Sequence, residues 1–291
     1  MSKPLSWLKP IAIKSEIYFG FFLSAILLMF CSTKVMAQGN LMITPRRVVF
    51  EGQKKTQELN LANTGKDTAR YLISMMEIRM REDGTFEQIT APDSGQNFAS
   101  HYVRFFPRSV TLGPGEAQTV KIQIIKQSQL LAGEYRSHIY FRALPIEKPL
   151  GEKEISKDTS GISVHLTPIF GISIPVIIRV GEPNSQVNLS NTKFEMMNDS
   201  IPVLNMVFNR AGNISVYGDL KIDFISSSGK VKQVGEIKGI AVYTPTSSRK
   251  IRITLDRIAG IDYKTGKLHI VYTTSADSKS VKIAETELML L

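Results

Sequence analysis

The stretch GISVHLTPIFGISIPVIIRV, residues 161–180, carries the pattern from which the fold class can be inferred. From Ile162 to Ile178 every even position except Pro168 holds a large apolar residue, whereas the odd positions are mixed. A period of two is typical of a β-strand with one apolar face. Strands in globular proteins usually contain about 5–6 residues. The sequence therefore predicts one unusually long strand, whose apolar face must be covered by something.

The start of the chain has the features of a secretory signal. Lysines precede the apolar run IYFGFFLSAILLMF (residues 17–30), and STKVMAQ follows soon after it. We expect residues 1–37 to be a signal peptide that is cleaved after Ala37, with no stable membrane insertion afterwards. The alternative is an uncleaved anchor, although the run is shorter than the ~20 residues that a span usually needs. Lipidation at Cys31 is disfavoured because the bulky Phe30 precedes it.

Composition limits the classes of protein that the chain could be. The only Cys and the only Trp, Cys31 and Trp7, lie in the expected signal peptide. The mature protein would therefore have no disulfide, no thiol chemistry and no antibody-type core built on a Cys pair and a Trp. The net charge of +10 is dispersed, without a run of five basic residues. This pattern favours a solvated surface over nucleic-acid binding.

Short alternating segments separated by turn residues occupy the rest of the chain, and none sustains a helical period. We expect an all-β protein with two immunoglobulin-like β-sandwich domains, residues 38–181 and 182–291, joined by a short hinge at GEPNSQ. The charged segment PIEKPLGEKEISKDTSG, residues 145–161, is expected to be a mobile loop. Strands are expected at 41–50, 56–63, 69–80, 101–107, 118–125, 135–144, 162–180, 202–212, 214–226, 250–256, 267–274 and 281–290, with hairpin-type turns at Gly212-Asn213 and Thr265-Gly266.

Signals of catalysis and of metal binding are weak. The four histidines have no metal-ligand spacing, and the motifs HExxH, GxSxG and GxGxxG are absent. SSSGKV (226–231) is only superficially similar to a phosphate-binding loop, because Val231 stands where Ser or Thr should follow Lys230. We expect a hairpin turn there instead. The sequence therefore predicts no enzyme, no cofactor and no metal site.

Three segments together resemble the PapD-like periplasmic chaperones of pilus and fimbrial assembly: RVVFEG (47–52), FPRSVTLGPGEAQTVKIQI (106–124) and GEYRSHIYFRALP (133–145). The resemblance covers most of residues 41–180 and is weak beyond residue 185. It implies a periplasmic protein with two immunoglobulin-like domains and with pilus or fimbrial subunits as partners. An outer-membrane assembly component is a further candidate partner.

The resemblance also implies how the long strand is covered. Such subunits resemble sandwiches that lack a strand, and the chaperone lends one by donor-strand complementation. Main-chain hydrogen bonds then supply affinity and alternate side chains supply specificity. Ile162, Val164 and Leu166 match the donated residues, and Phe170 to Ile178 are expected to stay in the chaperone's own core. From periodicity alone, an alternating strand is more often half-buried in its own sheet.

Two basic residues of this family anchor the carboxylate at the subunit's C-terminus. The Arg of the first strand matches Arg47. The Lys of the last strand has no counterpart, because Gly171 or Ser173 holds that place. Either a base such as Arg136 or Arg142 compensates, or one charge holds the carboxylate.

Two other classes of protein compete with this interpretation. A structural or adhesive cell-surface protein would more naturally carry a donor extension at its own N-terminus, whereas only residues 38–40 precede the first expected strand. A secreted hydrolase or carbohydrate-binding sandwich would need clustered aromatics or carboxylates at loop tips, and the mature chain has no Trp.

Overall fold

The structure is a computed structural model that describes residues 41–145, 169–275 and 280–290. The expected signal peptide lies outside these ranges, as do most of the expected loop and the donor residues Ile162, Val164 and Leu166. Among the described residues, the helices are two three-residue 3₁₀ segments, Ser100–Tyr102 and Gln127–Gln129, neither of which could span a bilayer. All other regular structure there is β-strand, so the predicted fold class is confirmed.

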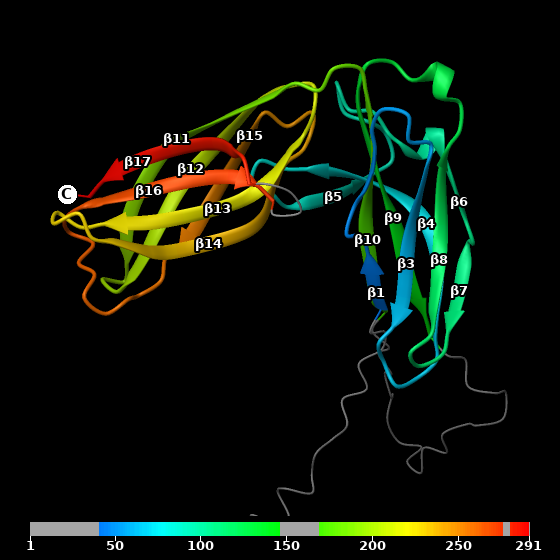
Figure 1. The fold of residues 1–291 in the computed structure, drawn as a ribbon, viewed down its shortest axis with the longest axis horizontal. Helices are drawn as coiled ribbons and strands as arrows, with labels where there is room; N and C mark the ends of the chain where they lie inside the picture. The colour runs from blue at the N-terminus through cyan, green and yellow to red at the C-terminus, as the bar shows by residue number, and fades with distance from the viewer. Residues whose placement is uncertain (1–40, 146–168, 276–279, 291) are drawn as a thin grey trace, which may run out of the picture. The chain divides into compact units, whose positions relative to one another are not determined.

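The first β-sandwich is built from strands β1 to β10 in two sheets (Figure 1). One sheet has the order β1-β3-β8-β6, and the other has the order β2-β10-β9-β4-β5, with β7 paired to β4. The strands are β1 (Leu41–Thr44), β2 (Val48–Phe50), β3 (Thr56–Asn63), β4 (Ala69–Met80), β5 (Phe86–Ile89), β6 (Val103–Phe106), β7 (Ser109–Leu112), β8 (Ala117–Ile124), β9 (Gly133–Leu144) and β10 (Gly171–Val180).

The strand expected at residues 41–50 is in fact two strands in different sheets. β1 pairs antiparallel with β3, whereas β2 pairs in parallel with β10. Pro45 lies between them, and a proline both lacks the N–H that a strand interior requires and fixes its own φ. The chain therefore crosses from one sheet to the other at TPRR, and Arg47 is placed directly before β2.

β10 is the described part of the long alternating segment. It pairs antiparallel with β9 from Gly171 to Val180, and Ile174, Val176 and Ile178 are buried. Phe170, which was expected in the core, is 54% exposed and is not part of the buried cluster. Phe170 precedes β10, whereas Ile172 is partly buried and packs against the core cluster. The expected core strand is thus wrong at Phe170 and correct from Ile172 to Ile178.

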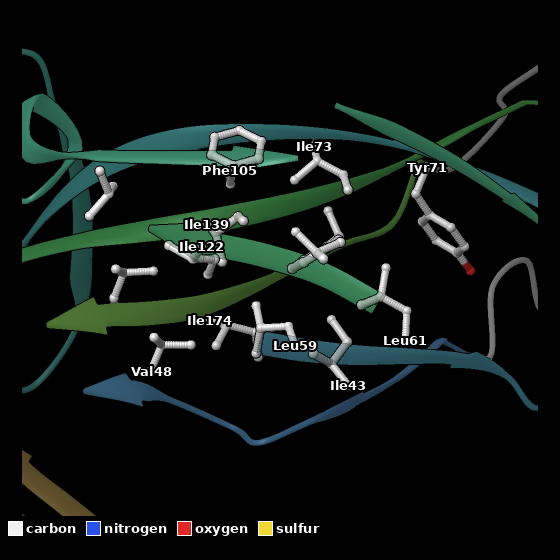
Figure 2. Close-up of a cluster of buried hydrophobic side chains, with 14 of the residues drawn as sticks. Ile43, Val48, Leu59, Leu61, Tyr71, Ile73, Phe105, Ile122, Ile139 and Ile174 are labelled. Carbon is white, nitrogen blue, oxygen red and sulfur yellow. The ribbon is translucent and has the colours of Figure 1, made fainter. Parts of the chain in front are cut away.

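The core of the first sandwich lies between its two sheets (Figure 2). Leu59 and Ile122 contribute from one sheet, and Ile139 and Ile174 contribute from the other. Leu59, Ile122 and Ile139 are completely buried. This apolar burial is the main stabilising contribution available to a sandwich whose described part contains no cysteine.

The second β-sandwich is built from strands β11 to β17. One sheet has the order β11-β12-β15 and the other the order β14-β13-β16-β17. Its core includes Phe208 and Tyr272, whose rings meet edge to face at 5.1 Å between centroids. The strands are β11 (Ser185–Met197), β12 (Ile201–Gly212), β13 (Val216–Ile225), β14 (Val231–Val242), β15 (Ser248–Thr254), β16 (Lys267–Thr274) and β17 (Lys282–Met289).

Turn chemistry in the second half predicted hairpins correctly at one place and wrongly at two. The turn at residues 226–230 joins the paired strands β13 and β14, as expected. Gly212-Asn213 is not a hairpin, because β12 and β13 lie in different sheets. Thr265-Gly266 precedes β16, which lies in a different sheet from β15. Turn residues show that the chain reverses, but not which sheet it enters.

Four strands were not expected from the sequence: β5, β7, β11 and β14. β11 begins at Ser185, within the segment that was interpreted as a hinge. β11 and β14 contain many polar residues and give a weak alternation, whereas β5 and β7 have only four residues each, too few for a period of two to be recognised.

Packing in the first sandwich gives a matched pair of leucine variants. Leu59→Ala should lower the free energy of unfolding by about 2–5 kcal/mol, because the side chain is 0% exposed and leaves a cavity. Leu131→Ala is the control, since that side chain is 77% exposed, and its effect should stay within about 0.5 kcal/mol. Urea denaturation followed by circular dichroism measures both. Equal effects would contradict the assignment of Leu59 to the core.

Candidate functional site

The predicted functional residues that the structure describes gather around the first half of β10. The N–H of Ala143 on β9 donates to the carbonyl of Phe170 at 2.9 Å. Because such pairs alternate along an antiparallel ladder, the main-chain groups of Gly171 and Ser173 point away from β9. On that side β2 pairs only with Val176–Ile178, and no other described strand pairs with β10. Gly171 and Ser173 therefore form an open strand edge, called here the β10 edge.

Arg47 lies at the end of the β10 edge. The parallel register aligns Val48 with Val176, so Arg47 falls beside Pro175. The Cζ atom of Arg47 lies 3.6 Å from the centroid of the Tyr217 ring, which belongs to the second sandwich. Among the described residues, the Arg47 guanidinium has no hydrogen bond to a side chain and no carboxylate within 4.0 Å. The site thus combines unpaired main-chain groups with an unneutralised cation.

The outward face of the sheet beside the edge carries two more of the predicted residues. Ser173 is exposed and lies opposite Tyr140 on β9, and the exposed Arg142 lies opposite Gly171. A Cβ atom at Gly171 would clash with the Tyr140 ring, so this close approach requires glycine. Arg142 has no ion pair within the described ranges and is available to an anion.

Arg136, the other candidate to replace the missing lysine, is engaged elsewhere. Its Nη2 atom donates to the Glu134 carboxylate at 2.8 Å, and its side chain is 7% exposed. Arg179 Nε donates to the same carboxylate at 3.1 Å. From the second sandwich, the Ser215 N–H donates at 3.0 Å and the Ser215 hydroxyl also donates. Glu134 therefore links the two sandwiches. Arg136, one of the two candidates to replace the missing lysine, is already paired with this carboxylate.

Two buried groups at this junction, Glu134 and His138, have pKa values below their ordinary ones. Burial alone would raise the pKa of Glu134, but Arg136, the Ser215 hydrogen bonds and Arg179 together hold that pKa below its ordinary 4.5. Burial and the neighbouring Arg136 charge lower the pKa of His138 to about 3. Glu134 is therefore ionised and His138 neutral at pH 7.

A second group of contacts joins the hairpin β4–β5 to the second sandwich. The Thr246 hydroxyl donates to the Met80 carbonyl at 2.9 Å. The N–H of Lys250 donates to the Glu82 carbonyl at 2.6 Å. Phe86 stacks on Tyr243 with ring centroids 5.6 Å apart. These contacts join residues 243–250 of the second sandwich to the first sandwich, separately from the Glu134 junction at the start of β13.

Sequence reasoning missed Glu134, Arg179, Ser215 and Tyr217. A signal existed for the first two, since each is a charged residue inside an alternating strand and cannot be buried there without a partner. For Tyr217 there was none, because its partner Arg47 lies in the other sandwich.

Comparison with known proteins finds no matching family model and no matching curated protein. Among solved structures, the YadV chaperone has 13% identity and a TM-score of 0.44, covering 86% of this chain and 99% of that one. The E. coli chaperone DraB has 15% identity and a TM-score of 0.41, covering 88% of this chain and 98% of that one. The CsuC–CsuE chaperone–tip adhesion subunit pre-assembly complex of Acinetobacter baumannii has 14% identity and a TM-score of 0.43, covering 84% of this chain and 98% of that one. All three structures contain a chaperone.

The Glu134 junction predicts a specific response to mutation and to pH. Glu134→Gln should lower the free energy of unfolding at pH 7 by about 3 kcal/mol, because it leaves the buried Arg136 without its counter-charge and leaves Arg179 with only the more exposed Glu51. Since folding lowers the pKa of Glu134, its contribution is present above pH 4.5 and is lost as the pH falls through the folded-state pKa. Urea denaturation at pH 7 and pH 4 measures the difference.

Two comparisons separate the contribution of Glu134 from the titration of His138 and from the loss of any exposed carboxylate. Folding also lowers the pKa of His138, so the stability of every variant that retains His138 should already decline below pH 6.5. Glu58→Gln is the control, because Glu58 is exposed on β3. A loss as large in Glu58→Gln as in Glu134→Gln would contradict the role of the junction.

Proposed function

We propose that this protein is a periplasmic chaperone that binds pilus or fimbrial subunits by strand addition at the β10 edge. The observation that carries the proposal is the edge itself, where the main-chain groups of Gly171 and Ser173 have no described partner. Ile169 and Phe170, directly before it, are 44% and 54% exposed. An open apolar edge is an aggregation hazard unless a partner covers it, and an extended segment of another chain is the partner that fits.

The position of β2 and the charge of Arg47 together favour one polarity for the bound strand. β2 runs parallel to β10 and begins at Val48, so it closes the edge from that point onward. A client strand that runs parallel to β10 on the open part must therefore end where β2 begins. Its terminal carboxylate then lies at Arg47. The guanidinium offers two parallel N–H donors to a carboxylate, so direction and charge favour the same arrangement.

Ile162, Val164 and Leu166 complete the proposal, as the resemblance to PapD-like chaperones implies. They precede Ile169 and Phe170 with the same period of two, and in the complex they would enter the open groove of the subunit. Once the expected signal peptide has been removed, the protein would act in the periplasm. The capped subunit would then pass to an outer-membrane assembly component.

Ser173→Pro tests strand addition. The variant removes one N–H from the β10 edge and should weaken binding roughly tenfold, while stability stays close to that of the wild type because this N–H has no described partner. The probe is a short fluorescein-labelled peptide in which Val and Thr alternate and which ends in a free carboxylate, called here the strand peptide. Binding is measured by fluorescence anisotropy.

Ser173→Ala is the matched control, because it removes the hydroxyl and keeps the N–H. Its affinity for the strand peptide should equal that of the wild type. If both variants bind as the wild type does, or if the wild type does not bind, strand addition at this edge is wrong.

Arg47→Ala tests the carboxylate anchor. Removing one side of a charge pair in an interface costs roughly 2–5 kcal/mol, so binding of the strand peptide should weaken by about tens- to thousands-fold. The peptide with an amidated C-terminus should bind wild type and Arg47→Ala equally. Arg46→Ala is the control, since Arg46 is exposed in the bend between β1 and β2 and should have far less effect. An Arg47→Ala protein that still prefers the free acid would rule out this anchor.

A further inference from the structure

Tyr217 lies in the second sandwich, yet it contacts the proposed anchor directly. The distance of 3.6 Å between Arg47 Cζ and the ring centroid is close to the optimum for contact between carbon atoms. So short a separation brings the guanidinium over the face of the ring, where the cation is attracted by the ring quadrupole. The five N–H donors of an arginine lie in the plane of its guanidinium. Stacking therefore holds the cation without using up the donors that a carboxylate would need.

The Tyr217 ring has contacts of its own within the second sandwich. Gly239 has φ +76°, and a Cβ atom there would lie only 2.8 Å from the Tyr217 hydroxyl oxygen, so the ring packs against bare backbone. Two residues before Tyr217, both the N–H and the hydroxyl of Ser215 donate to Glu134. The start of β13 is thus tied to the first sandwich immediately beside the stack. Tyr217 is 39% exposed, and its ring is supported on one side by the backbone at Gly239 and at its base by the tethered start of β13.

A second arginine, Arg136, also lies over a tyrosine ring, but its charge is neutralised by a carboxylate. Arg136 lies 3.8 Å from the centroid of Tyr243, but its guanidinium is paired with Glu134 and buried. Arg47 is half-buried, and no carboxylate lies within 4.0 Å of it in the described part of the chain. Of these two stacked cations, only Arg47 therefore has its charge available to a ligand.

We infer that Tyr217 is a positioning residue that holds the Arg47 guanidinium flat, with its donors directed to the end of the β10 edge, so that one arginine binds the carboxylate without a second base. This inference rests on the proposed function. A free arginine side chain carries about 2 kcal/mol of rotamer entropy, and a preformed stack reduces what is lost when the carboxylate binds. The absence of a lysine from FGISIPV, residues 170–176, is compensated by an aromatic ring from the other sandwich.

The test compares the affinity of the strand peptide with a free carboxylate to that of the amidated peptide. Tyr217→Leu should reduce the preference for the free acid by about fivefold, which corresponds to about 1 kcal/mol of cation–π interaction. Tyr217→Phe keeps the ring and should keep the preference within about twofold. The amidated peptide should bind all three proteins equally, because the β10 edge is unchanged.

Two controls separate positioning from a general structural effect. Tyr243→Leu removes the other stack and should leave the acid preference unchanged, even if stability falls. In an Arg47→Ala background, Tyr217→Leu should cause no further loss, as expected for residues that act as one unit.

The outcomes distinguish the inference from the proposed function. If the wild type prefers the free acid and Tyr217→Leu retains that preference, Tyr217 is not a positioning residue and the proposed function stands. If Tyr217→Phe loses the preference as Tyr217→Leu does, the hydroxyl acts and stacking is overturned. If the wild type binds neither peptide, the proposed function fails and the inference fails with it.

Discussion

The buried Glu134 carboxylate is the interaction on which the geometry of the site depends. A carboxylate with a fully buried side chain is stable only if its charge is matched and its lone pairs are satisfied. Here that requires Arg136 on β9, Arg179 at the end of β10 and Ser215 from the second sandwich at the same time. If any one of these partners is displaced, the buried charges that remain keep their desolvation cost but lose part of the attraction that offsets it. The start of β13, and with it Tyr217, is therefore held against the end of the first sandwich.

The β10 edge exists because β2 is short. β2 contributes three residues, whereas β10 has ten, so most of this side of β10 has no described neighbour in the sheet. The cause lies in TPRR, where Pro45 ends β1 and the chain changes sheets. Pro175, which has no N–H to donate, occupies the point where the open and closed parts of the edge meet. One strand thus contributes to the core in its second half and has an edge without a described neighbour in its first half.

The two arginines near this strand illustrate how burial decides the availability of a charge. Arg136 and Arg47 both stack on tyrosines of the second sandwich, at 3.8 and 3.6 Å. Arg136 is neutralised by Glu134, and its role is structural. Arg47 has no carboxylate within 4.0 Å among the residues that the structure describes, so its fork of donors is the one that the proposed function assigns to a terminal carboxylate.

The sequence by itself determined the all-β class and the alternating segment whose later part became β10, whereas Arg47 as a candidate anchor came from the resemblance to PapD-like chaperones. The first two depend on a local property, a period of two, which one segment displays alone. Only the tertiary structure decided that residues 41–50 divide between two sheets, that Phe170 is exposed, and that Tyr217 supports Arg47. Each of these outcomes depends on which distant strand becomes a neighbour. Neither turn residues nor periodicity indicate that choice, because the contacts form between residues that lie far apart in the sequence, by more than half the chain for Arg47 and Tyr217.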